Sequence, residues 1–208
     1  MALLVAAVLT IARPALAEPV TVAALGDSLT AGYGLPTEQG LVPQLQAWLD
    51  AQGAEVRLLN AGVSGDTTAG GLARLEWTLT PEVDALIVTL GGNDLLRGID
   101  PASSRANLDA ILHGAQARGL PVLLIGLPAP ANFGPDYQSA FNAIYPELAA
   151  RYGTLLVPDF FAPLTADDPA APGRFLQADG LHPSAEGVAL IVESLGPEVL
   201  ALLALVPR

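Results

Sequence analysis

The chain has 208 residues, a length that fits one domain, and 51% of them are hydrophobic while only 14% are charged. That balance excludes intrinsic disorder, and the formal net charge of −12 argues against a surface that binds nucleic acid. All nine basic residues are Arg and there is no Cys, which excludes Lys and thiol nucleophiles, a P-loop, disulfides and iron–sulfur clusters. The only two His, His113 and His182, lie far apart in the sequence, so we expect no metal site.

Residues 1–17 resemble a secretory signal peptide. The apolar run from Ala2 to Ala12 is too short to span a bilayer, and Ala15-Leu16-Ala17 has the pattern of a cleavage site. No basic residue precedes the run and Arg13 follows it, which is unusual for such a leader; the alternative is a disordered start. We expect cleavage after Ala17, one mature domain over residues 18–208, and a periplasmic or secreted protein.

Beyond this segment, short apolar runs alternate with helical patterns. Five runs without polar alternation predict buried strands, at Val20–Leu25, Glu55–Asn60, Ala85–Leu90, Val122–Leu127 and Thr154–Val157. Helices are expected between them, at Leu41–Ala51, Thr67–Thr78, Pro101–Arg118 and Pro135–Arg151. The alternation predicts an α/β fold, a five-stranded parallel sheet covered by helices on both faces, with a surface loop at Pro163–Pro172.

The C-terminal segment is apolar enough to suggest a membrane span. Glu193, Glu198 and the Gly196-Pro197 pair argue against one, because acids are costly in lipid and Pro ends helices. We expect a helix from Ser184 to Leu195, a short terminal turn from Pro197 to Leu205, and no stable membrane span.

Three candidate catalytic residues lie after strands or in loops. Ser28 follows the first strand, where it can be either a helix cap or a nucleophile, and a nucleophilic hydroxyl needs a base. His182 lies three residues after Asp179, so the carboxylate can hold one ring nitrogen while the other faces Ser28. Taken without Ser28, that loop is also consistent with a turn that leads into a helix. His113 falls inside a predicted helix, where we expect a solvated side chain.

Acyl transfer also needs hydrogen-bond donors for the developing negative charge. Gly62, after the second strand, can offer a backbone N–H, and Asn93, after the third, a side-chain N–H. Each is equally consistent with a turn or a helix cap. The carboxyl ends of parallel strands share one edge of a sheet, so we expect Ser28, Gly62 and Asn93 to lie near His182.

Four sequence blocks resemble the GDSL or SGNH hydrolase superfamily, in the order expected: G-D-S-L-T-A-G-Y-G (26–34), N-A-G-V-S-G-D-T-T (60–68), G-G-N-D (91–94) and D-G-L-H-P (179–183). The stretches at 91–98 and 141–149 are similar to the bacterial branch that contains acyl-CoA thioesterase I, lysophospholipase and arylesterase.

The resemblance implies a three-layer, flavodoxin-like α/β/α fold and an esterase without cofactor that acts on small acyl esters and often on thioesters or lysophospholipids. It also implies Ser28 as nucleophile with Asp179 and His182 as partners, and an oxyanion hole formed by the amides of Ser28 and Gly62 and the side chain of Asn93.

Substrate contacts are expected in two apolar loops, Leu127–Phe133 and Phe160–Phe175, which can line an acyl groove or simply pack against the sheet. Leu127 and Phe133 of the first loop are the expected contact residues. One alternative function is a carbohydrate acetyl esterase of the same superfamily, although aromatic residues make up only 5% of the chain. The alternative outside enzymes is a catalytically inactive, doubly wound ligand-binding module.

Overall fold

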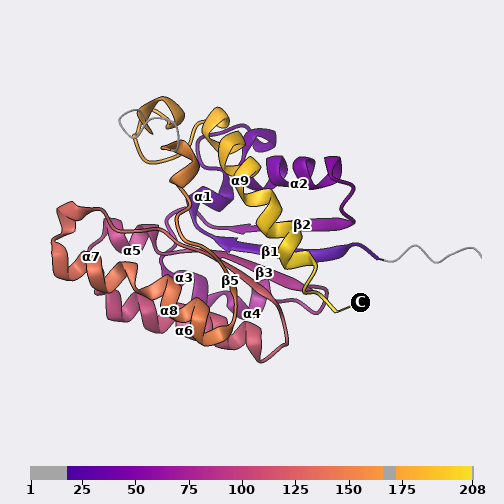
Figure 1. The fold of residues 1–208 in the computed structure, drawn as a ribbon, viewed down its shortest axis with the longest axis horizontal. Coiled ribbons are helices and arrows are strands. Elements are labelled where there is room, and N and C mark those ends of the chain that lie inside the picture. The colour runs from indigo at the N-terminus through magenta and orange to yellow at the C-terminus, as the bar shows by residue number, and fades with distance from the viewer. Residues whose placement is uncertain (1–17, 166–171, 208) are drawn as a thin grey trace, which may run out of the picture.

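A computed structural model describes residues 18–165 and 172–207 (Figure 1). In those residues five parallel strands form one sheet between two layers of helices. This confirms the predicted α/β/α sandwich, and the strand order β2-β1-β3-β4-β5 is that of flavodoxin-like folds. The expected signal peptide, residues 1–17, and positions 166–171 of the expected surface loop lie outside the described residues.

The sheet places the ends of its central strands side by side. Its strands are β1 (Val20–Gly26), β2 (Val56–Gly62), β3 (Ala85–Thr89), β4 (Val122–Ile125) and β5 (Leu155–Val157). β1 pairs with β2 on one side and with β3 on the other, so Gly26 at its carboxyl end lies beside Gly62 and Thr89. The winding of the chain reverses between β1 and β3, and in such sheets ligands bind outside the strand ends at this point.

Helices cover both faces of the sheet. α2 and α9 pack together on one face, and α6 and α8 lie on the other (Figure 1). The helices are α1 (Ser28–Ala31), α2 (Leu41–Ala51), α3 (Thr68–Ala73), α4 (Leu75–Thr78), α5 (Gly92–Leu96), α6 (Pro101–Gln116), α7 (Pro135–Asn142), α8 (Ile144–Tyr152) and α9 (Ala185–Leu203).

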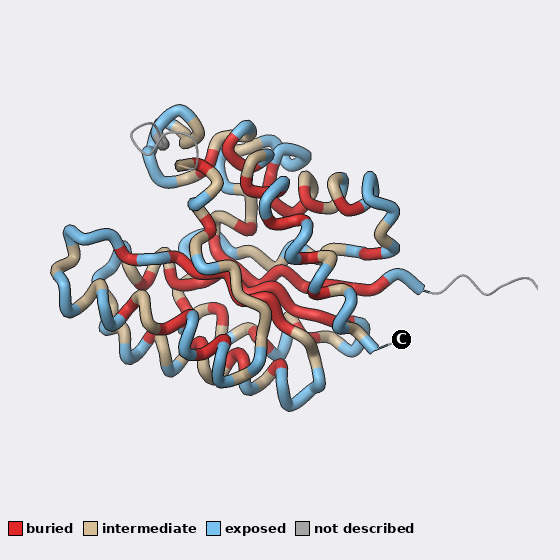
Figure 2. The backbone as a smooth tube through the Cα atoms, viewed as in Figure 1, coloured by how far each residue is buried: buried red, intermediate tan, exposed pale blue. Residues whose placement is uncertain are grey.

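The core follows the apolar runs of the sequence. Every residue of β1, β3 and β4 is buried, whereas β2 at the edge of the sheet is only partly so (Figure 2). Strands covered by helices on both faces need side chains that are apolar on both faces, which explains the absence of polar alternation.

Two predicted helices are each divided in the structure. The expected helix Pro135–Arg151 breaks at Ala143, because Pro146 has no N–H for the carbonyl of Asn142 and its ring crowds that carbonyl. The expected helix Thr67–Thr78 breaks at Arg74, whose backbone φ of −108° and ψ of 8° leave the helical range.

The prediction of a helix that stops at Leu195 is wrong, since α9 continues through Pro197 to Leu203. Pro197 costs one backbone hydrogen bond, but the helix beyond it still buries Val199 and Leu202 in the core. Within the described ranges, no helix is long and apolar enough to cross a membrane.

Candidate active site

Ser28 lies where the internal strand β1 turns sharply into α1. A Cβ on Gly26 would come within 2.0 Å of Thr30 Oγ1, so only glycine allows this approach. Asp27 caps the helix by accepting the N–H of Leu29 at 3.0 Å. Ser28 therefore begins α1 with its hydroxyl at the carboxyl edge of the sheet.

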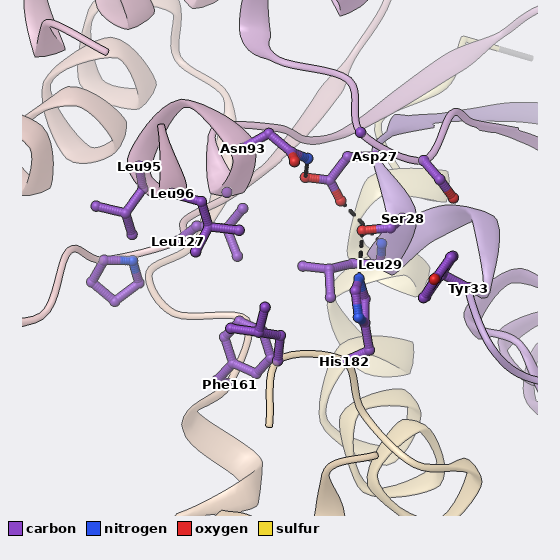
Figure 3. A pocket seen from close by; sticks show the side chains of 15 residues that line it. Asp27, Ser28, Leu29, Tyr33, Asn93, Leu95, Leu96, Leu127, Phe161 and His182 are labelled. Carbon is purple, nitrogen blue, oxygen red and sulfur yellow. Dashed lines mark hydrogen bonds between the residues drawn. The ribbon is translucent and has the colours of Figure 1, made fainter. Parts of the chain in front are cut away.

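Ser28, His182 and Asp179 form a continuous chain of hydrogen bonds. Figure 3 shows the bond between Ser28 and His182. Ser28 Oγ lies 2.8 Å from His182 Nε2, and His182 Nδ1 lies 2.7 Å from Asp179 Oδ2. The imidazole side chain and the backbone N–H groups of Leu181 and His182 lower the pKa of Asp179 to about 2. An ionised Asp179 fixes the proton of His182 on Nδ1, which leaves Nε2 free to accept the proton of Ser28.

The loop that carries His182 is attached to the loop that follows Ser28. Gln177 Nε2 donates to the carbonyls of Tyr33 at 2.8 Å and Pro183 at 3.0 Å. The Gln177 backbone N–H donates to the carbonyl of His182 at 2.7 Å, and the ring of Tyr33 lies 4.7 Å from the His182 ring. These contacts fix the distance between the hydroxyl and the imidazole.

Asn93 reaches the same edge from α5. Its Nδ2 donates to Asp27 Oδ2 at 3.3 Å, which leaves its second N–H available (Figure 3). Asp94 holds the helix from the other side, because its buried carboxylate accepts the backbone N–H and hydroxyl of Thr68 and the hydroxyl of Ser104. Burial raises the pKa of Asp27 to about 6, although the N–H groups of Leu29 and Asn93 oppose the rise.

The structure does not bring the Gly62 amide to the site. The Gly62 N–H donates to Asn60 Oδ1 at 3.0 Å, and its Cα packs against the backbone of Ala31. Gly65, three residues later, lines the pocket with a φ of +86°, and its N–H has no acceptor among the described residues. The N–H of Gly62 is therefore bonded within its own strand, while Gly65 is the glycine of this segment that lines the pocket.

The predicted end of the second strand explains why the sequence pattern favoured Gly62 over Gly65. The prediction ends the second strand at Asn60, which makes Gly62 the first glycine of the following loop. In the structure β2 continues to Gly62, so this glycine belongs to the strand. Since Gly62 pairs with the last residue of β1, only a later residue can fold back over Ser28.

A pocket of about 360 Å³ opens beside Ser28 (Figure 3). Its walls are largely apolar, and their aliphatic and aromatic residues are Leu29, Tyr33, Leu95, Leu96, Leu127, Pro128, Phe161 and Leu181. Leu127 thus lies where the sequence placed it. Phe133 does not line this pocket and instead stacks on Tyr137, with ring centroids 5.3 Å apart. Pro128 and Phe161 also line it, and both belong to the loops in which the sequence placed substrate contacts. Leu29, Tyr33, Leu95, Leu96 and Leu181 were not anticipated, because their approach to the pocket depends on tertiary contacts.

The arrangement supplies the parts that acyl transfer requires. It has a hydroxyl with a base, an acid that orients the base, N–H groups at the end of β1, and an apolar cavity next to them. Within residues 18–165 and 172–207, no group of three or more His, Asp or Glu side chains could hold a metal ion.

Comparisons with known proteins agree with this chemistry. The model of the GDSL-like lipase/acylhydrolase family matches residues 24–190. The chain is 42% identical to the esterase TesA of Pseudomonas aeruginosa over 184 residues, which cover 88% of this chain and 89% of the relative. It is 34% identical to thioesterase 1/protease 1/lysophospholipase L1 of Escherichia coli K12 over 183 residues, covering 88% and 84%. The crystal structure of AlinE4, an SGNH-hydrolase family esterase, superposes with a TM-score of 0.73 at 42% identity and covers 93% of this chain and all of that one.

Proposed function

The chain belongs to the GDSL-like lipase/acylhydrolase family and is an esterase, and from this premise we propose that Ser28 is its catalytic nucleophile. The observation that carries the proposal is the chain of hydrogen bonds from Ser28 Oγ through His182 to Asp179. Those three groups stand in the order that a nucleophile, its base and an orienting acid require.

The reaction then has two steps. His182 Nε2 takes the proton of Ser28 as Oγ bonds to the substrate carbonyl carbon, and the carbonyl electrons move onto oxygen. The C–O bond to the leaving group breaks as those electrons return, and His182 protonates the departing alcohol. Water then attacks acyl-Ser28 by the same route, with His182 as base, and releases the acid.

The negative oxygen of each tetrahedral intermediate needs donors fixed in advance. We assign this role to the backbone N–H groups of Ser28 and Gly65 and to the side chain of Asn93. Gly65 is included because it lines the pocket with an N–H that has no acceptor in the described part of the chain, and Asn93 because Asp27 fixes its orientation. Removal of one such donor typically lowers turnover by about 10² to 10³.

The pocket walls favour substrates with an apolar acyl group. Leu127, Leu95 and Phe161 offer hydrocarbon contacts, and the lining drawn from the described residues includes no Arg to bind a phosphate. We therefore propose neutral carboxylic esters, including aryl esters, as the preferred substrates, with thioesters and lysophospholipids accepted less well. A site for acetylated sugars would be more polar, so that alternative lacks support.

We also propose that the enzyme is exported to the periplasm or secreted. The support is the apolar run and cleavage pattern within residues 1–17 of the sequence.

A fluorophosphonate probe and a pair of serine variants test the nucleophile. Ser28→Ala should lower kcat for p-nitrophenyl butyrate by about 10³-fold or more and should abolish covalent labelling, because no other hydroxyl of the described residues is hydrogen-bonded to His182 Nε2. Ser64→Ala is the matched control, since Ser64 lines the same pocket and the variant should still be labelled. Wild-type turnover in folded Ser28→Ala would refute the assignment.

A further inference from the structure

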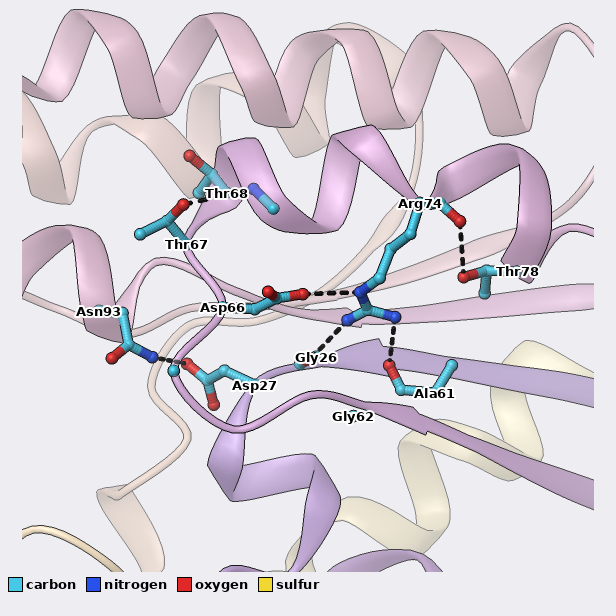
Figure 4. A network of polar contacts seen from close by, with 12 residues as sticks. Gly26, Asp27, Ala61, Gly62, Asp66, Thr67, Thr68, Arg74, Thr78 and Asn93 are labelled. Carbon is cyan, nitrogen blue, oxygen red and sulfur yellow. Dashed lines mark hydrogen bonds and ion pairs between the residues drawn. The ribbon is translucent and has the colours of Figure 1, made fainter.

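Arg74 joins the two loops that carry the backbone donors of the site. It lies at the break between α3 and α4, where its side chain turns toward the carboxyl ends of β1 and β2 (Figure 4). Its guanidinium makes three hydrogen bonds: Nη2 donates to the Gly26 carbonyl at 2.8 Å, Nη1 to the Ala61 carbonyl at 2.7 Å, and Nε to Asp66 Oδ2 at 2.6 Å.

Each of these acceptors lies within four residues of a backbone donor of the proposed oxyanion hole. Gly26 is two residues before Ser28, and Asp66 directly follows Gly65. Ala61 lies at the end of β2, where the loop that carries Gly65 begins. Apart from Arg74, the Val63 N–H, which donates to the Gly26 carbonyl at 3.0 Å, also connects the two loops at this point. Arg97 Nη2 holds Gly65 itself by donating to its carbonyl at 2.8 Å, but Arg74 is the side chain that bonds to both loops. The distance between the Ser28 and Gly65 amides therefore depends in part on the Arg74 guanidinium.

Partial burial and the shape of the guanidinium restrict the orientation of the Arg74 side chain. The side chains of Arg74 and Asp66 are only 21% and 18% exposed, so the pair is largely shielded from water. A guanidinium is planar and presents its donors at fixed angles, which a lysine ammonium on a flexible stem cannot reproduce. One Arg side chain can thus hold two carbonyls and a carboxylate in a single plane.

We propose that Arg74 is a positioning residue for catalysis, which sets the oxyanion-hole amides of Ser28 and Gly65 relative to each other without contacting the substrate. This inference rests on the proposed function. A misplacement of about 1 Å in such a site can lower the rate by about 10²-fold, so small shifts of these loops have large kinetic effects.

The test compares Arg74→Lys with Arg118→Lys. Arg118 is a matched control, because it also donates to a backbone carbonyl, that of Leu79, and to a carboxylate, that of Glu76, but lies away from the pocket. Competent sites are counted by fluorophosphonate titration to completion, and kcat is expressed per titrated site. A short-chain trifluoromethyl ketone, which forms an oxyanion on reaction with Ser28, reports on the donors directly.

For Arg74→Lys we expect kcat per site to fall by about tenfold to a hundredfold, with KM within about twofold of the wild-type value. The affinity for the trifluoromethyl ketone should fall by a similar factor, and Arg118→Lys should change neither quantity. In Arg74→Ala, added methylguanidinium should restore part of kcat per site.

A purely structural role predicts a different result. It would reduce the number of titratable sites in Arg74→Lys but leave kcat per site within threefold of wild type, and that outcome would overturn the inference. Failure of the proposed function itself is separate, since it would appear as activity in Ser28→Ala or as a wild-type enzyme that the probe does not label.

Discussion

A buried carboxyl lies directly beside the proposed nucleophile. Asp27 is only 1% exposed, and it faces N–H groups rather than a guanidinium. Burial raises the pKa of Asp27 to about 6 from an ordinary value near 3.8. Because the folded protein holds this proton more tightly than the unfolded chain does, folding takes up a proton between those two values of pH.

The pKa of Asp27 predicts how stability changes with pH. Its contribution is fully present below about pH 4 and is lost as pH rises through 6, at a cost on the order of 3 kcal/mol by pH 8. Asp27→Asn cannot ionise, so its free energy of unfolding should rise relative to wild type between pH 4 and 8. Urea unfolding of both proteins at several pH values measures this difference, and parallel pH profiles would show that Asp27 titrates normally.

At the scale of single residues, the sequence predicted side chains better than backbone donors. The sequence predicted that Ser28, His182, Asp179 and Asn93 lie close together, and the structure brings them to one edge of the sheet. Few residue types offer such side chains, which restricts the choice. A backbone N–H is offered by almost every residue, so selecting Gly62 rather than Gly65 depended on the exact end of β2. That end is set by pairing with β1, which is a tertiary contact.

The strands were predicted closely, while the helices differ from prediction where tertiary contacts act on them. An apolar run covered on both faces has one stable state, so β1, β3 and β4 follow from sequence alone. The break at Arg74 instead depends on acceptors in β1 and β2, and the continuation of α9 past Pro197 depends on its packing against α2. Local sequence rules contain neither contact.

The contact between α2 and α9 predicts an unusual response to alanine. Gly196→Ala should normally stabilise a helix by about 1 kcal/mol, but here the new Cβ would lie 2.5 Å from the ring of Trp48. We expect a net loss of about 1 to 3 kcal/mol in the free energy of unfolding. The same substitution in a Trp48→Leu background should be nearly neutral, and equal costs in both backgrounds would show that the ring does not oppose the methyl group.

For the whole molecule, charge bears on the choice of substrate. The chain carries a formal net charge of −12, and the pocket lining contains no Arg. Such a field repels anionic leaving groups, and salt weakens the repulsion because the Debye length falls from about 30 Å at 0.01 M to about 8 Å at 0.15 M.

Salt should therefore raise kcat/KM severalfold for a short acyl-CoA between these two ionic strengths. The matched control is a thioester of N-acetylcysteamine with the same acyl chain, which has a neutral leaving group and should respond little. Steady-state rates for both substrates at each salt concentration measure the effect. If salt changed kcat/KM equally for both substrates, the charge of the leaving group would have no effect on the rate.

The two halves of the site are held by very different numbers of bonds. Ser28 follows β1, an internal strand that pairs with a neighbour on each side along its length. Asp179 and His182 instead lie between Leu176 and Pro183, a segment closed by one isolated bridge and by the contacts of Gln177. Segments held by few bonds can open by sub-global fluctuations, which cost less free energy than denaturation. We therefore expect the proposed base to separate from Ser28 more readily than the sheet unfolds, so that activity should be lost on heating before the fold melts.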